Sequence, residues 1–242
     1  MLYCRRIVIL GVLGKVMRAW ISNHKISRDS AILSISYGLA AIYWYRSSNA
    51  TVLDVLAKVS STALLTYYAA RTDSKQMTAG MLFHCFGDGL IELPGKSLIP
   101  AMLTFLVGHS INIARFQKNR FSLSELNLPR VLAMAAFTIY GAAFTHLLTT
   151  KTSGVIQYAI PIYSLAISTM FLLACIQKER SLRVFLGALL YVASDNIIGA
   201  NLFVKKIPAA NYLSWPLYFL GQRMMLPDLH DVETVHKKSH PR

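Results

Sequence analysis

The sequence predicts an all-α polytopic membrane bundle of about eight transmembrane helices, with the N-terminus and the C-terminus both cytoplasmic. Of its 242 residues, 54% are hydrophobic and only 15% are charged, and the mean hydropathy is +0.43. The apolar residues fall into runs of about 17–22 residues, long enough to cross a hydrocarbon core of ~30 Å at 1.5 Å per residue. Basic residues gather on alternate loops. A soluble domain rarely combines these features.

Polar residues divide the chain into eight apolar segments with short connections. The expected spans are 30–46, 51–70, 76–94, 97–115, 129–149, 154–176, 183–203 and 207–226. Short loops make sequential helices antiparallel neighbours. We therefore assign residues 30–226 to one eight-helix membrane domain.

The two ends of the chain lie outside the predicted membrane domain. Residues 1–29 include IVILGVLG, an apolar run that is too short to span and is flanked by basic residues. We expect an interfacial helix there, and a signal sequence or transit peptide is the alternative. Residues 227–242 are expected to form a polar, solvated tail.

The orientation follows from the distribution of Lys and Arg, because positive charge is retained on the cytoplasmic side. With eight spans, 19 of the 25 basic residues fall on the side of the two termini and 5 on the opposite side. Lys58, the remaining basic residue, lies deep within a predicted helix. This asymmetry predicts that both termini are cytoplasmic.

The net charge of +14 does not indicate nucleic-acid binding. The basic residues lie between the apolar runs, where they orient helices and meet anionic headgroups, and they do not alternate with aromatic residues as in base-stacking modules. Cys4, Cys85 and Cys175 are isolated, so the sequence favours reduced thiols over a disulfide framework or a zinc site.

Two carboxylates lie deep in predicted spans, where a charge is expensive and usually marks a site or pathway. Asp88 follows Lys75 by 13 residues and Asp195 follows Arg183 by 12, which places both about 18–20 Å from the cytoplasmic edge. Lys58, on a third helix, reaches a similar depth from the opposite side. We expect the three groups to converge, although each could also serve only to join helices.

Other polar residues in the spans are candidate ligands of a substrate. His109 and Gln222 could bind substrate or carry protons, but a hydrogen bond between helices explains them equally well. Tyr163 and Tyr218 could bond a headgroup, although tyrosine is also common at membrane interfaces.

The third to eighth spans resemble the lysoplasmalogenase family of polytopic membrane hydrolases, the YhhN-like proteins. The order and spacing of five stretches, covering about 140 residues, carry this resemblance: FHCFGDGLIELPG, FLVGHSINIARF, AIPIYSLAISTM, GALLYVASDNIIGAN and LYFLGQRMM. Lys58 falls where the family has a Lys-Pro pair, but Val59 replaces the proline. Glu92 also occupies a position where the family would have an apolar or aromatic residue.

The resemblance implies hydrolysis of the vinyl ether bond of a lysoplasmalogen, which gives a fatty aldehyde and glycerophosphocholine or glycerophosphoethanolamine. Residues 30–226 would then be the hydrolase domain. This reaction needs an acid and then a base, and two buried carboxylates can divide these tasks. We expect Asp88 and Asp195 to be catalytic, Lys58 to hold the ionised carboxylate or the phosphate, and no metal or other cofactor to be required.

Alternatives from other functional classes stay open at this point. A proton-coupled or amphiphile transporter would also place Asp, Lys and His in a bundle, and a non-catalytic lipid-binding protein is possible given Val59. A metal-dependent lipid hydrolase would need a histidine cluster, but His84 and His109 lie within spans and His146 lies near an outer helix end. The expected partners are lysophospholipid and membrane lipids. The expected location is the endoplasmic reticulum or another endomembrane in a eukaryote, and the inner membrane in a bacterium.

Overall fold

The structure is a computed structural model that describes residues 28–46, 51–71, 74–93, 98–178 and 181–227. The predictions for residues 1–27 and 228–242 lie outside these residues. The described chain forms eight α-helices and a 3-10 turn, η2 (Leu123–Glu125). The helices are α2 (Arg28–Arg46), α3 (Val52–Ala70), α4 (Lys75–Leu90), α5 (Leu98–Phe116), α6 (Leu128–Thr150), α7 (Gly154–Cys175), α8 (Ser181–Phe203) and α9 (Ala210–Met225). In the described part, therefore, the all-α prediction is confirmed.

Four of these helices, α5 to α8, are long and apolar enough to cross a membrane. The other predicted spans are helical too, but α4 and α9 contain only 16 residues each, about 24 Å of helix against a core of ~30 Å. That all eight helices cross, and that both termini are cytoplasmic, stays a prediction.

Of the two short helices, α4 ends earlier and α9 begins later than the hydropathy pattern predicted. The third expected span ran to residue 94, but α4 ends at Leu90 with Ile91 as its C-cap, ahead of Pro94. The eighth was expected from residue 207, but α9 begins after Ala209, which has a left-handed φ of 58° and follows Pro208. Apolar residues at both boundaries lie in turns, so hydropathy overestimated the length of these helices.

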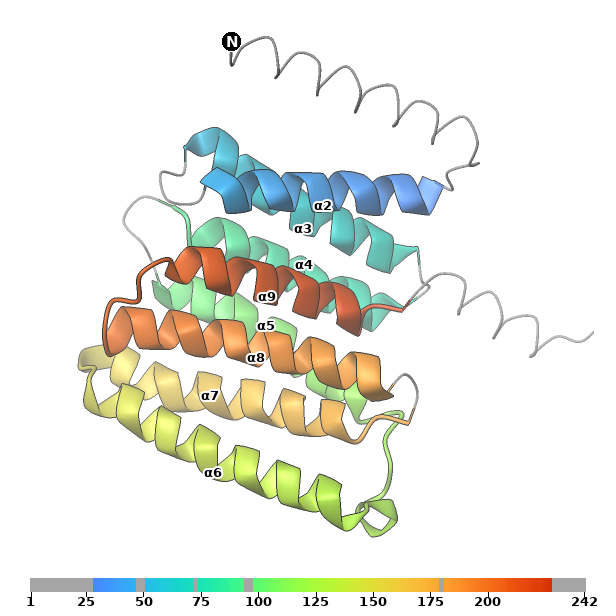
Figure 1. Cartoon of the computed structure of the whole chain (residues 1–242), viewed down its shortest axis with the longest axis vertical. Coiled ribbons are helices and arrows are strands. Elements are labelled where there is room, and N and C mark those ends of the chain that lie inside the picture. Colours follow the sequence, from blue (N-terminus) through green and yellow to red (C-terminus); the bar gives the residue numbers. More distant parts are fainter. Residues whose placement is uncertain (1–27, 47–50, 72–73, 94–97, 179–180, 228–242) are drawn as a thin grey trace, which may run out of the picture.

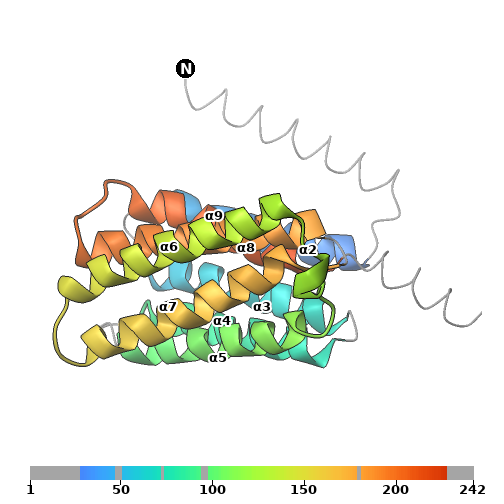
Figure 2. The ribbon, with the colours of Figure 1, turned by 90° about the horizontal axis from the view of Figure 1, so that it is seen from below.

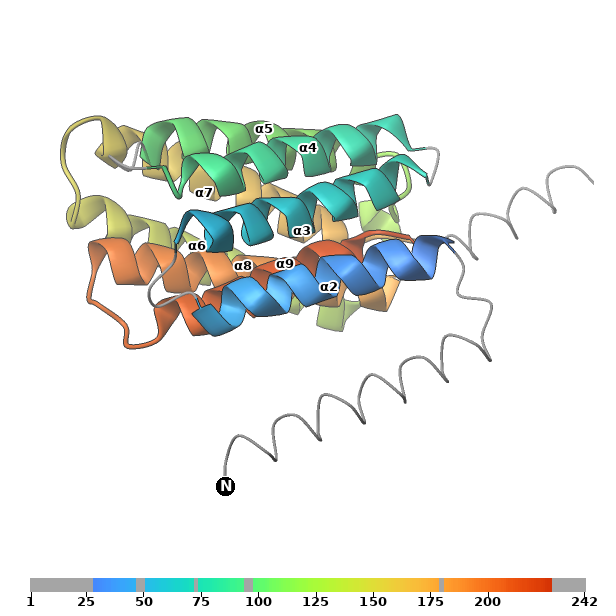
Figure 3. The ribbon, with the colours of Figure 1, turned by 90° about the horizontal axis from the view of Figure 1, so that it is seen from above.

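Seven helices form a closed ring. Each packs on the next in the order α2, α3, α4, α5, α7, α8 and α9, and α9 packs on α2 again. Figure 1 shows them lying side by side, and Figures 2 and 3 show two layers, with α3, α4, α5 and α7 in one and α2, α6, α8 and α9 in the other. The eighth helix, α6, packs on α7 and slightly on α8, and Leu148 is its one buried residue. The outer face of α6 is thus free to meet lipid.

Glycines let the helices that surround the centre of the ring approach closely. A Cβ atom at Gly187 of α8 would lie 2.8 Å from the carbonyl oxygen of Gly221 on α9, and one at Gly221 would lie 2.7 Å from the oxygen of Gly187. On α5, a Cβ at Gly108 would lie 2.2 Å from Cδ2 of His84 on α4. These two contacts, as in other membrane bundles with small residues at helix crossings, bring polar side chains of α4, α5, α8 and α9 together.

Candidate active site

Two aspartate–tyrosine pairs face the interior of the ring. The hydroxyl of Tyr218 on α9 donates a hydrogen bond to Oδ2 of Asp88 on α4 at 3.0 Å, and Asp88 is only 2% exposed. The hydroxyl of Tyr163 on α7 donates to Oδ2 of Asp195 on α8 at 2.6 Å. Asp195 is partly buried. Each carboxylate is therefore held by a phenol from a different helix.

His109 extends the second pair. Its Nε2 atom lies 3.3 Å from the hydroxyl of Tyr163, and its Nδ1 atom lies 3.3 Å from the sulfur of Met170. Because Tyr163 donates its own proton to Asp195, the phenol oxygen can accept from His109 only if Nε2 carries a hydrogen. His109 is fully buried and contacts Asp195 only through Tyr163 among the described residues.

Tyr191 connects the two pairs, and the sequence reasoning missed it. Its ring centroid lies 5.1 Å from that of Tyr218 and 5.1 Å from that of His109. Tyr218 is the partner of Asp88, and His109 contacts Tyr163, which is the partner of Asp195. Tyr191 therefore lies between the two aspartate–tyrosine pairs.

Lys58 belongs to a neighbouring cluster. Its Nζ atom forms an ion pair of 2.8 Å with Oε1 of Glu92, which also accepts a hydrogen bond of 2.7 Å from the hydroxyl of Tyr43. The rings of Tyr43 and Trp215 lie 5.2 and 5.3 Å from the same ammonium group. Lys58 is close enough to Asp88 for an electrostatic interaction, but its direct partner is the carboxylate of Glu92.

Gln222, the remaining predicted substrate ligand, is fully buried. It lies one helical turn beyond Tyr218 on α9 and beside His84. Its side chain therefore belongs to a level of the bundle next to that of the aspartates.

Sequence reasoning also undervalued His84 and Glu92. In the sequence, His84 stands out only as a possible metal ligand and Glu92 only as a departure from the family pattern. Helical spacing could have found His84 and Tyr191, because each precedes an aspartate by four residues and so shares its helix face. Glu92 follows Asp88 by the same spacing, but α4 ends at Leu90, so the position of Glu92 depends on the turn after the helix.

The described residues contain no group of three or more His, Cys, Asp or Glu side chains close enough to hold a metal ion. Cys85 and Cys175 are free thiols.

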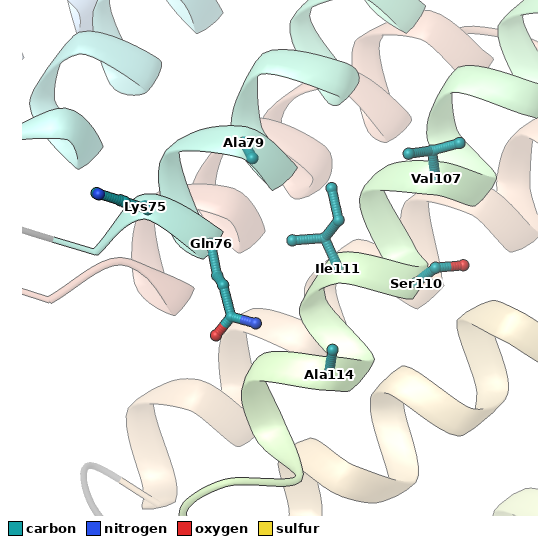
Figure 4. A pocket seen from close by; sticks show the side chains of 7 residues that line it. All are labelled: Lys75, Gln76, Ala79, Val107, Ser110, Ile111 and Ala114. Atoms are coloured by element: carbon teal, nitrogen blue, oxygen red, sulfur yellow. The ribbon is translucent and has the colours of Figure 1, made fainter.

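A shallow groove of about 460 Å³ opens between α4 and α5, away from the aspartates. Figure 4 shows its lining, which consists of Lys75, Gln76, Ala79, Val107, Ser110, Ile111 and Ala114. Lys75 starts α4 and Asp88 lies near its end, about 20 Å away along the helix. The groove is thus on the outer surface of two helices that carry site residues, and it is no part of the site.

Comparisons with known proteins add one finding. No curated protein and no solved structure gives a significant match. The profile of the YhhN family, which includes lysoplasmalogenase, matches residues 53–227. This match covers α3 from its second residue through α9, and every residue placed above in the two aspartate–tyrosine pairs lies within it. The chain belongs to the YhhN family.

Proposed function

We propose that this chain is a multi-pass membrane hydrolase that cleaves the vinyl ether bond of lysoplasmalogens. Membership of the YhhN family suggests a lysoplasmalogenase-like role. The observation that carries the specific reaction is the pair of aspartates, Asp88 and Asp195, which face one interior and are each hydrogen-bonded to a tyrosine.

The proposed reaction uses the two carboxyl groups in turn. A protonated carboxyl group donates its proton to the alkenyl carbon, which leaves an oxocarbenium ion. The carboxylate of the other aspartate accepts a proton from water as the water oxygen bonds to the oxocarbenium carbon. As the resulting hemiacetal collapses, its hydroxyl proton passes to the first carboxyl group and the second carboxyl group gives its proton to the glycerol oxygen. The carbon–oxygen bond breaks, the aldehyde and the glycerophospho-alcohol are released, and both aspartates return to their starting states. Each step needs only an acid or a base within hydrogen-bond reach.

The surroundings of the aspartates suit this chemistry. Tyr163 and Tyr218 fix the two carboxyl groups, so that neither has to reorient during proton transfer. A single-chain lipid would enter the ring laterally from the bilayer, with the vinyl ether below its headgroup. Lys58, in the neighbouring cluster, would meet the phosphate in place of its partner Glu92.

The proposal is tested by measuring aldehyde release from an alkenyl lysophospholipid by the purified chain in lipid nanodiscs. Asp88→Asn and Asp195→Asn should each lower the rate by a factor of at least ~100, the scale of general acid–base catalysis. Asparagine keeps the shape of aspartate and an oxygen that can accept from the tyrosine, so folding should be preserved. Asp29→Asn, at the start of α2 and paired with Arg71, is the matched control and should retain activity.

Two results would count against this proposal. If either folded variant keeps a rate near that of the wild type, the two-carboxylate mechanism is wrong. If the wild-type chain releases no aldehyde but carries protons or amphiphiles across liposomes, the chain is a transporter.

A further inference from the structure

A second polar layer lies one helical turn away from the aspartates. His84 precedes Asp88 on α4 by four residues, Tyr191 precedes Asp195 on α8 by four, and Gln222 follows Tyr218 on α9 by four. Residues four apart share a helix face, and they are about 6 Å apart along the axis. Because α9 runs antiparallel to α8, the three residues fall on the same side of the aspartate level.

These three side chains are entirely buried, and most of their polar atoms lack a partner. His84, Tyr191 and Gln222 are each 0% exposed. The amide of Gln222 lies beside the ring of His84 and can satisfy one atom of each side chain. The remaining polar atoms, including the hydroxyl of Tyr191, have no hydrogen-bond partner among the described residues. The hydroxyl of Ser194, three residues beyond Tyr191 on the same helix, is in the same condition.

Polar atoms in such a cluster need a hydrogen-bond partner. A buried polar group without a partner costs about 1–3 kcal/mol, and most buried polar atoms in folded proteins are paired with protein groups or ordered water. Several such atoms in one layer would consume a large share of a stability that is typically only ~5–15 kcal/mol. Buried waters in proteins characteristically bond to groups of this kind, with two to four partners each.

The chemistry of the layer favours water over a lipid headgroup. The layer offers donors and acceptors together: Gln222 provides both, a neutral His84 provides one of each, and Tyr191 donates. Water, which also donates and accepts, matches this set, whereas a phosphate only accepts. The layer is also closely packed, because the ring of His84 lies against the backbone at Gly108 and its centroid lies 5.2 Å from that of His109 and 5.5 Å from that of Tyr191.

We propose that His84, Tyr191 and Gln222 form a binding site for internal water, and that this site supplies the hydrolytic water. The second part rests on the proposed function. Water moves one helical turn from the layer to the level of Asp88 and Asp195, where its oxygen bonds to the oxocarbenium carbon and its proton passes to the carboxylate base. The three residues are positioning residues for the water.

Radiolytic hydroxyl labelling tests the water site without substrate, because radicals formed from bound water modify adjacent side chains even when these are buried. The full chain is irradiated in nanodiscs and analysed by mass spectrometry. Tyr191 should be modified well above Phe171, an aromatic residue of the apolar core that is 4% exposed. Labelling of Tyr191 no higher than that of Phe171 would overturn the inference.

Two variants test the supply of water. Gln222→Met keeps the side-chain length but removes both polar atoms, and Tyr191→Phe removes a single hydroxyl, so at least one should fold. Each should lower kcat about tenfold, equivalent to ~1.4 kcal/mol, and leave KM unchanged. Leu65→Met, at another fully buried position, is the control for repacking and should retain the kcat of the wild type.

The outcomes separate this inference from the proposed function. If the wild type releases aldehyde and Tyr191 is labelled, but both variants keep the kcat of the wild type, the supply of water from this layer is wrong. If Tyr191 is labelled and the wild type releases no aldehyde, the water site is supported and the proposed reaction is overturned.

Discussion

Asp88 and Tyr218 are 130 residues apart in the chain, and a hydrogen bond of 3.0 Å joins their side chains across the ring. The bond links α4, in one layer, to α9, in the other. Asp195 and Tyr163 repeat the arrangement on α8 and α7 with a bond of 2.6 Å. Both carboxyl groups are therefore fixed by tyrosines of the opposite layer, and closure of the ring positions the candidate catalytic pair.

The two tyrosines should contribute to the rate through the position of the carboxyl groups. Tyr163→Phe and Tyr218→Phe each remove one hydroxyl and keep the ring, so we expect kcat to fall by a factor of about 10, the value of a hydrogen bond worth ~1.4 kcal/mol. Aldehyde release measures the effect. Tyr158→Phe changes an exposed tyrosine of the same helix as Tyr163 and should have no effect. A fall of the same size in Tyr158→Phe would show that the assay reports general damage.

Replacing one member of the ion pair of Lys58 and Glu92 should lower the stability of the fold more than replacing both. Lys58→Met leaves a carboxylate and Glu92→Gln leaves an ammonium group without its 2.8 Å partner. The side chain of Glu92 is 24% exposed. We therefore expect each single variant to lower the free energy of unfolding by about 3 kcal/mol, the lower end of the range for buried pairs.

The double variant Lys58→Met with Glu92→Gln should recover most of that stability. Unfolding in detergent micelles, followed by circular dichroism, measures all three variants. A double variant whose loss equals the sum of the two single losses would contradict this account, because no coupling would then exist between the two side chains.

Sequence reasoning predicted all eight helices and named several residues that hydrogen bonds join in the structure. All eight expected segments are helices, because runs of apolar residues report which parts of the chain avoid water. Depth counting also placed Asp88 and Asp195 at one level, since the rise per residue of an α-helix is constant. Composition could not show which side chains meet across the ring, so Tyr191 and the direct ion pair of Lys58 with Glu92 were missed. The pairing of Lys58 with Glu92 depends on the early end of α4, which hydropathy did not predict.

Gly108 should be intolerant of even one added methyl group. In Gly108→Ala the new Cβ would lie 2.2 Å from Cδ2 of His84 and 3.2 Å from the carbonyl oxygen of Gly80, so the ring of His84 or the helix must move. Overpacking of this kind costs about 1–3 kcal/mol. We expect a lower unfolding temperature and reduced aldehyde release.

Gly38→Ala is the matched control for Gly108→Ala. Gly38 lies within α2, and a Cβ there would meet nothing within 4 Å. Alanine should therefore be neutral or raise stability by up to ~1 kcal/mol, because it favours the helix. Equal losses in the two variants would show that the fit of His84 against α5 is not responsible.

The orientation of the bundle can be tested across a single helix. Helix α6 has 23 residues, about 35 Å, and the predicted topology places its start on the cytoplasmic side. In a Cys4→Ser background, Ser124→Cys marks the loop before α6 and Ser153→Cys the loop after it, and both serines are exposed. In sealed vesicles with the cytoplasmic face outward, a membrane-impermeant maleimide should modify Ser124→Cys directly and Ser153→Cys only after detergent is added.

The background itself should react little, because Cys85 is buried and Cys175 is partly buried. Modification of both variants without detergent would exclude a crossing by α6, and the reverse pattern would invert the orientation that the basic residues predict.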